Sequence, residues 1–201
     1  PPADIAVIGV GSLLPGSHTT RQYWENILEK VDAIREVPPE RWDWSLYYDS
    51  DKAARDKIYS KWGGFIDDLP FDPVRFGMPP NSVSSIDPMQ LLALAVVQQT
   101  LEDAGYADRR TGIAETTSVI LGFSGGLGEL GIGYGARSEI PRAFPGVAAE
   151  TLDYLPEWTE DSFAGILPNV SAGRVANRFN FGGANFTTDA ACASSLSAIY
   201  Q

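Results

Sequence analysis

The sequence is poor in the side chains that bind metals or form cross-links. Its 201 residues contain one cysteine, Cys192, and one histidine, His18. A single cysteine cannot form an internal disulfide, and no CxxC pair is present for zinc or redox chemistry. No carboxylate cluster stands at metal-ligand spacing either. We therefore expect a protein of the reducing cytoplasm without a metal site, in which His18 is a solvated loop residue.

Positive charge and long apolar runs are also scarce. Fifteen Lys and Arg stand against 26 Asp and Glu, a formal net charge of -11 that repels phosphate backbones and anionic lipid surfaces. No stretch approaches 18 uninterrupted apolar residues, and the first residues lack the basic and apolar regions of a signal peptide. Nucleic acid and membranes are therefore not expected partners.

Three glycine-rich places invite a phosphate-binding interpretation, and none supports it. Gly9-Val10-Gly11 lacks the third glycine of a dinucleotide fingerprint, and residues 122–135 lack the Lys-Ser or Lys-Thr of a P-loop. The third place, Gly182-Gly183, precedes a strand-like run. We expect turns at the first and third places, and a flexible or tightly turning loop over the seven glycines of 122–135.

Two short apolar runs predict buried strands, at residues 5–11 and 117–122, and residues 185–188 also indicate a strand. Between them stands a segment rich in aromatics and prolines, residues 38–80, for which we expect an irregular but ordered insertion. Trp42, Trp44 and Trp62 are its expected anchors. Strands that alternate with helical patterns indicate an α/β fold.

Helical periodicity appears in four places. One amphipathic helix is expected from Thr19 or Thr20 to Pro38-Pro39, with apolar residues at Tyr23, Trp24, Ile27, Leu28, Val31 and Ile34. A second follows Asp87-Pro88, a good cap and first-turn pair, and runs to Gly105; its wide apolar arc predicts burial on more than one side, centred on Met89, Leu92, Ala93, Val96, Val97 and Leu101. Shorter helices are expected at residues 168–175 and from residue 191 onward.

The two ends predict a piece of a longer polypeptide. The first residue is not Met, and the last seven residues lie in a helical pattern without a C-cap signal.

The segment around the only cysteine could carry chemistry. A strand-like run ends at Thr188, and Asp189-Ala190-Ala191 leads to Cys192 at the start of an expected helix. Unpaired amides and the helix dipole there favour the thiolate, and the same amides could accept the oxyanion that forms when a thiolate attacks a thioester. The alternative is that a cysteine among alanines and serines fills a core. Cys192 is the one candidate catalytic residue.

Resemblance adds to this interpretation. Asp189-Ala190-Ala191-Cys192-Ala193-Ser194-Ser195 resembles the active-site signature of β-ketoacyl synthases, written D-[TA]-A-C-[SA]-S-S. Further segments are similar to the same family in the same order along the chain: IAVIGVGSLLPG from residue 5, DAI from 32, VPPERW from 37, KWGGFI from 61, FDPVRFG from 71, IDPMQ from 86, LEDAGY from 101, SAGRV from 171 and FNFGG from 179.

The resemblance implies a thiolase-like fold with stacked α/β layers, of which this chain supplies the N-terminal half. Cys192 is then the nucleophile that takes an acyl group from a carrier protein and releases it to a carbanion formed from a malonyl-carrier thioester. No cofactor is bound directly, because the substrates ride on the phosphopantetheine of the acyl carrier protein. The family's two catalytic histidines and its general lysine lie downstream of its cysteine, beyond Gln201. The 201 residues alone are therefore expected to be incompetent for condensation.

The family also implies partners and alternatives. The partners are a second copy of the chain, which would pair through the strand near Asn185–Thr188 to form a homodimer, the acyl carrier protein, and further domains of a multidomain synthase. One alternative is a non-elongating ketosynthase, which accepts acyl chains without condensing them. A silent chain-length-controlling partner lacks the nucleophile, so Cys192 counts against it.

The chain departs from the family at two arginines. Ser12-Leu13-Leu14 replaces the usual C-R-F, and Met89-Gln90-Leu91 replaces Q-Q-R. These changes suggest a divergent branch near the polyunsaturated fatty acid synthases or iterative polyketide synthases. Residues 123–160 resemble the family only weakly.

Overall fold

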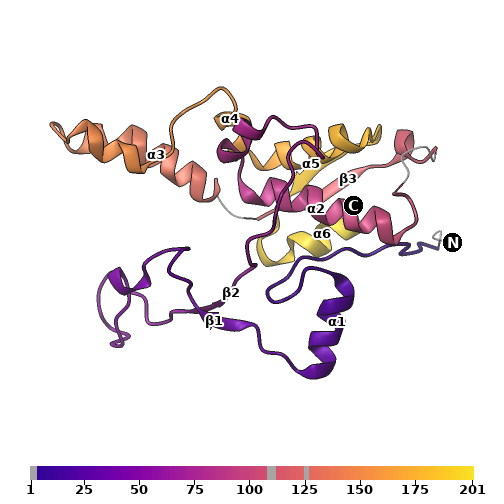
Figure 1. Ribbon diagram of the computed structural model, residues 1–201, viewed down its shortest axis with the longest axis horizontal. Helices are drawn as coiled ribbons and strands as arrows, with labels where there is room; N and C mark the ends of the chain where they lie inside the picture. Colours follow the sequence, from indigo (N-terminus) through magenta and orange to yellow (C-terminus); the bar gives the residue numbers. More distant parts are fainter. Residues whose placement is uncertain (1–3, 108–111, 125–126) are drawn as a thin grey trace. The chain divides into compact units, whose positions relative to one another are not determined.

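The computed structural model describes residues 4–107, 112–124 and 127–201. The chain divides into two compact units, Pro1–Pro70 and Phe71–Gln201 (Figure 1). Unit 1 contains helix α1 (Thr20–Glu29), strands β1 (Ile34–Glu36) and β2 (Trp62–Gly64), and the 3-10 helix η1 (Trp44–Leu46). Unit 2 contains the remaining elements, including the cysteine.

In unit 1, a tight turn leads into α1. Leu14 and Ser17 exchange two backbone hydrogen bonds of 2.9 Å across Pro15-Gly16. Gly16 has a φ of 71°, as the third position of a type II turn requires. The side chain of Thr19 then accepts a hydrogen bond from the Gln22 N–H at 3.2 Å, which caps the helix as predicted.

Helix α1 is shorter than its apolar pattern predicts. It ends at Glu29 because Lys30 takes the left-handed conformation, with a φ of 56°, and the Val31 N–H turns back to the Asn26 carbonyl at 2.9 Å. The periodic residue Ile34 opens strand β1 instead. The apolar spacing continues across this boundary, so periodicity alone could not locate the end of the helix.

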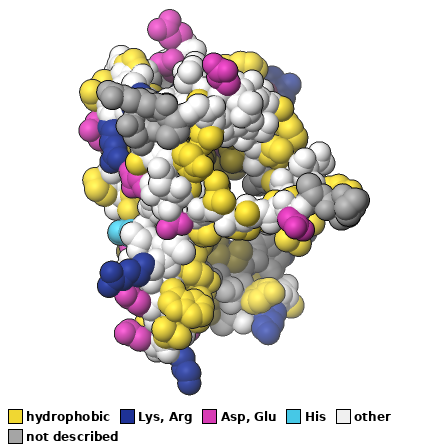
Figure 2. Space-filling model, turned by 90° about the vertical axis from the view of Figure 1, so that its right-hand side faces the viewer, with side chains coloured by type: hydrophobic (Ala, Val, Ile, Leu, Met, Phe, Trp, Pro, Cys, Tyr) yellow, Lys and Arg dark blue, Asp and Glu magenta, His cyan; other side chains and the backbone are white. Residues whose placement is uncertain are grey.

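The first predicted strand, residues 5–11, is wrong: this segment has no regular secondary structure. Ile5 and Val7 are 93% and 83% exposed. A strand needs a neighbour to satisfy its backbone groups, and among the described residues no other strand pairs with this segment. Figure 2 shows how much hydrophobic surface is open to solvent on one face of the molecule.

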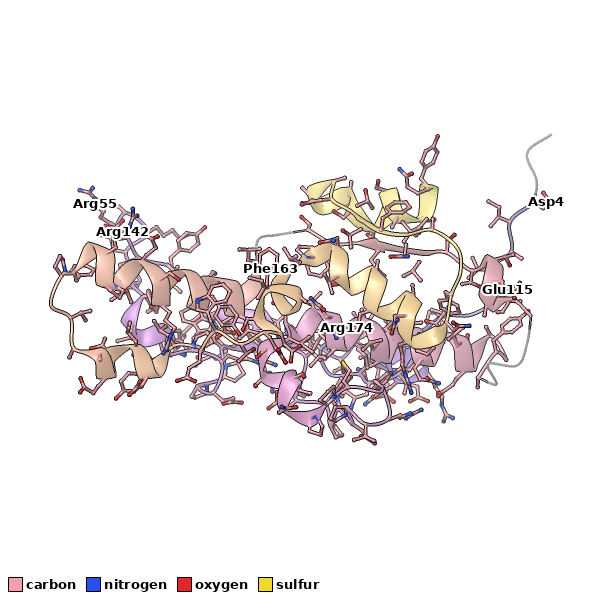
Figure 3. All side chains as sticks on the ribbon, turned by 90° about the horizontal axis from the view of Figure 1, so that it is seen from above. Asp4, Arg55, Glu115, Arg142, Phe163 and Arg174 are labelled. Atoms are coloured by element: carbon pink, nitrogen blue, oxygen red, sulfur yellow. The ribbon has the colours of Figure 1, made fainter. Side chains whose placement is uncertain are left out.

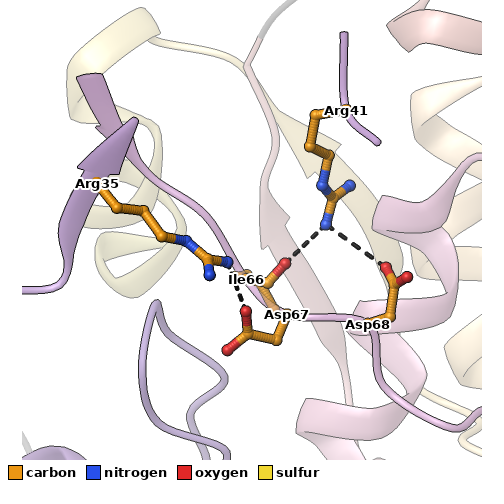
Figure 4. A network of polar contacts seen from close by, with 5 residues as sticks. All are labelled: Arg35, Arg41, Ile66, Asp67 and Asp68. Carbon is orange, nitrogen blue, oxygen red and sulfur yellow. Dashed lines mark hydrogen bonds and ion pairs between the residues drawn. The ribbon is translucent and has the colours of Figure 1, made fainter. Parts of the chain in front are cut away.

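Strands β1 and β2 pair antiparallel, with Ile34 opposite Gly64. The loop after β2 is joined to this hairpin by two arginines (Figure 4). Arg35 forms an ion pair with Asp67 at 2.5 Å. Arg41 donates to the Ile66 carbonyl at 2.6 Å and forms an ion pair with Asp68 at 3.7 Å. Both arginine side chains are about half exposed, so each ion pair is worth little on its own.

Only one of the three expected tryptophan anchors is partly buried. Trp44 packs edge-on against Tyr48, and the ammonium of Lys61 lies 4.2 Å from the Trp44 ring centre. Trp42 and Trp62 are 40% and 58% exposed. Trp42 packs edge-on against Tyr47 with ring centres 5.5 Å apart, but neither it nor Trp62 is a buried anchor.

The centre of unit 2 is a parallel pair of strands, β3 (Val119–Gly122) and β4 (Asn185–Thr188), both predicted from the sequence. Val119 and Leu121 point to one face, where they pack with residues of helix α5 (Pro168–Phe179). Gly122 belongs to the other face, where it meets the backbone of Ser194. Helices α5 and α6 (Ser194–Tyr200) therefore cover opposite faces of the pair, in a layered α/β arrangement.

The core of unit 2 lies between the strands, α5 and helix α2 (Pro88–Asp103). As predicted, Asp87 caps α2 through its side chain, and the residues from 90 to 101 are all buried or half-buried. The buried line runs through Gln90 and Leu94, whereas Met89 is 53% exposed. The core cluster consists of Phe76, Met78, Ile86, Leu94, Val119, Ala172, Val175, Ala176 and Phe179.

The glycine-rich segment is not the predicted loop. From Gly128 to Ala143 it forms helix α3, while residues 125–126 lie outside the described residues. Two of its glycines allow close packing, because a Cβ at Gly131 would overlap Leu127 and one at Gly133 would lie 2.7 Å from Pro156. Tertiary packing therefore overrides the low helix propensity of glycine here.

The remaining elements of unit 2 are short, and they are helix α4 (Ser162–Ile166) and the 3-10 helices η2 (Pro80–Ser85), η3 (Ala114–Thr116), η4 (Ala149–Tyr154) and η5 (Ala191–Ala193). Helix α5 is longer than the predicted 168–175 because it continues to Phe179, where Asn180 ends it in the left-handed conformation. In the described part of the chain, no helix is long and apolar enough to cross a membrane.

Candidate functional site

Cys192 lies between the end of a strand and the start of a helix. Strand β4 ends at Thr188, and Cys192 is the middle residue of η5, directly before α6. Its thiol is free and the residue is exposed. The arrangement differs from the prediction only in detail, because the first turn is a 3-10 helix. In the described part of the chain, Cys192 does not belong to the buried core.

The backbone just before the cysteine is strained. Ala191 has a φ of 49°, in the left-handed region that residues with a Cβ seldom adopt. Asp189 stabilises this turn, since its carboxylate accepts a hydrogen bond from the Ala191 N–H at 2.9 Å. Sharp strained turns of this kind are over-represented at functional sites.

Ser194 holds the same turn from the other side. Its hydroxyl accepts a hydrogen bond from the Ala190 N–H at 2.9 Å and donates one to the Ala191 carbonyl at 2.7 Å. The residue is 5% exposed. We call Asp189, Ser194 and the turn that they hold, residues 189–194, the cysteine turn.

The cysteine turn rests on the carboxyl end of β3. A Cβ at Gly122 would lie 2.6 Å from the carbonyl carbon and oxygen of Ser194, so only glycine permits this approach. The Phe123 N–H extends the strand pairing by donating to the Thr188 carbonyl at 3.0 Å. The end of the sheet therefore fixes the position from which the thiol is presented.

A cavity of about 240 Å³ opens at the same end of β3. Gly122, Phe123 and Ser124 form one wall, and the other walls come from the starts of α2, α3 and α5: Asp87, Met89, Gln90, Leu127, Gly128, Ile166, Leu167 and Pro168. Cys192 is not among these lining residues. The end of β3 thus both lines the cavity and contacts the cysteine turn.

A buried polar network below this cavity was not predicted. Gln90, which is 1% exposed, donates its amide to the carbonyls of Ala164, Gly165 and Leu167 at 3.1, 2.8 and 3.3 Å. Its side-chain oxygen accepts a hydrogen bond from Arg174 at 2.9 Å. The network ties α2 to α5 and to the segment that forms one wall of the cavity. Gln90 and Arg174 stand in separate motifs, IDPMQ and SAGRV, and nothing local in either indicates that they meet.

Burial sets the electrostatics of this network. Figure 3 shows Arg174 among the side chains of unit 2, while Arg142 lies toward the end of α3. Desolvation lowers the pKa of Arg174 below its ordinary value, and the charge of Asp161 acts in the opposite direction. The guanidinium remains protonated at neutral pH, so the hydrogen bond to Gln90 is charge-assisted.

A second buried network anchors α3. Tyr134, which is 1% exposed, accepts a hydrogen bond from the Ser162 hydroxyl at 2.9 Å. Ser162 in turn contacts Thr159, whose hydroxyl lies 3.0 Å from that of Ser85. These contacts hold the glycine-rich helix against α4 and η2, and only the tertiary structure brings them together.

The remaining candidates stay outside the site. His18 is exposed in unit 1, and its backbone N–H donates to the Gln22 side chain at 2.9 Å. Over residues 4–107, 112–124 and 127–201, no three His, Cys, Asp or Glu side chains gather as a possible metal site. Gly9-Val10-Gly11 forms no phosphate-binding strand–helix turn, and Gly182-Gly183 packs against the backbone of Glu115 and Thr117.

Comparison with known sequences gives one consistent result. Residues 3–201 match the family model described as beta-ketoacyl synthase, N-terminal domain. The chain is 37% identical over 207 residues to a polyunsaturated fatty acid synthase of a Thraustochytrium species, and 36% identical over 201 residues to the polyketide synthase ThaQ of Burkholderia thailandensis. These matches cover 97% and 98% of the chain but only 7% and 8% of the relatives.

Solved structures agree. The oxazolomycin ketosynthase domain OzmH KS7 of Streptomyces albus has a TM-score of 0.75 at 34% identity, over 96% of this chain and 30% of that one. The ketosynthase from module 6 of the bacillaene synthase of Bacillus subtilis has a TM-score of 0.69 at 28% identity, over 97% of this chain and 28% of that one. The chain thus spans less than a third of each solved relative.

Proposed function

We propose that the chain supplies the nucleophile of a condensing acyltransferase in polyketide or fatty acid synthesis. The proposal follows from its family, since the chain belongs to the β-ketoacyl synthases and corresponds to their N-terminal domain. The predicted thiolase-like fold, in its N-terminal half, is confirmed by the likeness to ketosynthase domains. The observation that supports the proposal most directly is the exposed thiol of Cys192 at the junction of β4 and η5, inside the motif that resembles the family signature.

In the first step of the proposed reaction, the Cys192 thiolate attacks the carbonyl carbon of an acyl thioester. A new carbon–sulfur bond forms, the bond to the phosphopantetheine sulfur of the acyl carrier protein breaks, and that sulfur leaves as a thiol with the proton that Cys192 gave up. Amide N–H groups at the start of the helix are the donors that would stabilise the oxyanion. The small side chains of Ala190, Ala191 and Ala193 leave room for the acyl carbonyl.

In the second step, a malonyl-carrier thioester loses carbon dioxide, and the resulting carbanion attacks the acyl group on Cys192. A carbon–carbon bond forms, and the cysteine sulfur leaves as a thiolate. The product is a β-ketoacyl thioester two carbons longer than the starting acyl chain. No cofactor binds the chain directly in this scheme, because both substrates are delivered on carrier proteins. The family's two histidines and its lysine, downstream of its cysteine, would complete the catalytic set.

The proposed partners follow from the same membership. They are the acyl carrier protein, the other domains of a multidomain synthase and a second copy of the chain. In the described part of the chain, β4 pairs with β3 alone, and its other edge can accept the strand of a second copy. Sedimentation of the full-length protein as a monomer only would contradict the dimer.

The test of the proposed function is acyl transfer to the full-length protein. After incubation with an acyl-carrier thioester, we expect the protein to gain the acyl mass and peptide mapping to place it on Cys192. Cys192→Ala should abolish this gain. Because residue 192 is exposed, the substitution should change the melting temperature by less than about 2 °C. Wild-type protein first blocked with iodoacetamide serves as the matched control.

Two outcomes separate the proposal from its alternatives. An acyl group found elsewhere, or no acyl group on folded protein, would contradict the assignment of Cys192. Acylated Cys192 that releases no β-ketoacyl product when malonyl-carrier thioester is added would instead identify a non-elongating ketosynthase.

A further inference from the structure

We propose that Ser194 is a positioning residue for the acylation of Cys192, acting through the strained backbone of Ala191. This inference rests on the proposed function, in which Cys192 is the nucleophile. Ser194 does not reach the reacting sulfur in the proposal. It acts by holding the peptide groups that precede the cysteine.

The hydroxyl of Ser194 makes hydrogen bonds on both sides of Ala191. It accepts from the Ala190 N–H at 2.9 Å and donates to the Ala191 carbonyl at 2.7 Å. Ser194 is 5% exposed, so water competes little for either bond. Ser194 thereby bonds the Ala191 carbonyl and the amide of the preceding residue, while the Ala191 N–H is bonded to the carboxylate of Asp189.

That conformation needs such support. Alanine is disfavoured at a φ of 49°, and the chain relaxes from it unless the surroundings hold it there. The direction in which the chain enters Cys192 depends on the backbone dihedral angles of Ala191, because residue 192 follows directly. Loss of the Ser194 hydroxyl should therefore let the thiol move from its position at the helix start.

Ser194 itself is held in place. Its carbonyl group packs against Gly122 so closely that a Cβ there would lie 2.6 Å away. The hydroxyls of Thr188 and Ser197 make a second contact between the end of β4 and α6, at 3.3 Å. Ser194 thus transmits the position of the rigid sheet to the strained turn.

The test measures two rates on full-length protein, for wild type and for Ser194→Ala. One is the rate of acyl transfer from an acyl-carrier thioester to Cys192, and the other is the rate of alkylation of Cys192 by iodoacetamide at neutral pH. We expect Ser194→Ala to lower acyl transfer at least tenfold and alkylation at least threefold. Ser195→Ala is the matched control, because it removes the same hydroxyl group from the next residue, which is exposed. Both rates should stay within twofold of wild type.

A double variant distinguishes the positioning role from simple packing. Glycine adopts positive φ freely, so Ala191→Gly should make the turn less dependent on the Ser194 hydroxyl. We expect the loss caused by Ser194→Ala to be at least threefold smaller when residue 191 is glycine. The rescue variant Ser194→Thr, which retains the hydroxyl, should keep more acyl transfer than Ser194→Ala.

The inference is overturned if Ser194→Ala acylates at the wild-type rate, if Ser195→Ala loses as much, or if glycine at 191 leaves the loss unchanged. If Ser194→Ala does not fold, Ser194→Thr is compared with wild type by the same two rates, and a tenfold loss of acyl transfer despite the retained hydroxyl overturns the inference. Failure of the proposed function can be distinguished from failure of this inference. In the first case wild type is not acylated at Cys192, while the ratio of the alkylation rates of wild type and Ser194→Ala still reports on the position of the thiol.

Discussion

At the scale of single residues, the buried side chain of Gln90 gathers four hydrogen bonds. It donates to three carbonyls and accepts from Arg174, and Gln90 itself and Gly165 are buried. Their hydrogen-bonding capacity must be met inside the protein, because an unmet buried donor or acceptor costs more free energy than a met one contributes.

We therefore expect Gln90→Leu to lower the free energy of unfolding by about 2–4 kcal/mol, because it leaves buried carbonyls and a charged guanidinium without their partner. Urea denaturation followed by circular dichroism measures this change. Gln98→Leu is the matched control on the same helix: its amide bonds the exposed carboxylate of Glu102, so a change within about 0.5 kcal/mol is expected. Equal effects of the two variants would contradict the importance of the buried network.

Residues whose roles are local could be predicted, whereas residues that meet across the fold could not. Thr19 and Asp87 cap helices within a few positions of their own sequence, so their chemistry indicates the structure directly. Gln90 and Arg174 stand 84 residues apart. Only the packing of α2 on α5 brings them together, and a single sequence contains no record of that packing.

At the scale of elements, two glycines with opposite surroundings test how the cysteine turn is supported. Gly122 ends β3 against the backbone of Ser194, while Gly135 lies on α3, where no atom lies within 4 Å of the position that an alanine methyl group would take. The same substitution by alanine should therefore have opposite consequences at the two positions.

We expect Gly122→Ala to destabilise the protein by about 1–3 kcal/mol, since the methyl group forces α6 away from β3. Acylation of Cys192 should slow together with this displacement. Gly135→Ala should instead stabilise α3 by about 0.5–1 kcal/mol, because alanine restricts the unfolded chain and favours helix. Thermal unfolding and the acylation rate of the full-length protein measure both effects. Stabilisation by Gly122→Ala would show that the close approach of strand and helix is not maintained.

Two helices were predicted wrongly from the sequence, for different physical reasons. The helix ending at Glu29 and the helix over Gly128–Ala143 both contradict the local pattern, one by stopping within an apolar periodicity and the other by forming from glycines. The left-handed Lys30 ends the first helix locally, whereas the close approach of Gly133 to Pro156 compensates for the poor helix propensity of glycine in the second. Strand β3 was predictable because a buried strand has a short, self-contained apolar run, and β4 because aromatic and β-branched residues favour strands.

At the scale of the whole molecule, the two units differ in how much core they have. Leu13 and Val37 are the buried hydrophobic residues described in unit 1, whereas the other buried hydrophobic residues described belong to unit 2. Burial of apolar surface is the main favourable contribution to stability. Unit 1 should therefore unfold more readily than unit 2.

The distribution of tryptophan makes this difference measurable. Four of the five tryptophans, at positions 24, 42, 44 and 62, belong to unit 1, while the long helices α2, α3 and α5 belong to unit 2. In urea, we expect the tryptophan emission of the 201-residue chain to change at a lower concentration than the helical signal at 222 nm. Trp158→Phe removes the tryptophan of unit 2 and should leave the early transition in place. Coincident midpoints would mean that the two units unfold as one.

The fold class could be inferred from the sequence at this scale, but the solvent exposure of its apolar segments could not. The alternation of strands and helices indicates an α/β fold, and the order of motifs indicates the family. Residues 5–11 nevertheless lie exposed, because a buried strand requires neighbours that no local pattern specifies.

The parallel pairing of β3 and β4 also constrains how the chain is made. Val119 lies opposite Asn185, so the pair cannot close until the whole intervening stretch has been synthesised. Closing so long a loop slows folding. During synthesis on the ribosome, the apolar side chains of Leu121 and its neighbours would therefore stay exposed until β4 has been made. A chaperone could bind the nascent polypeptide in that period.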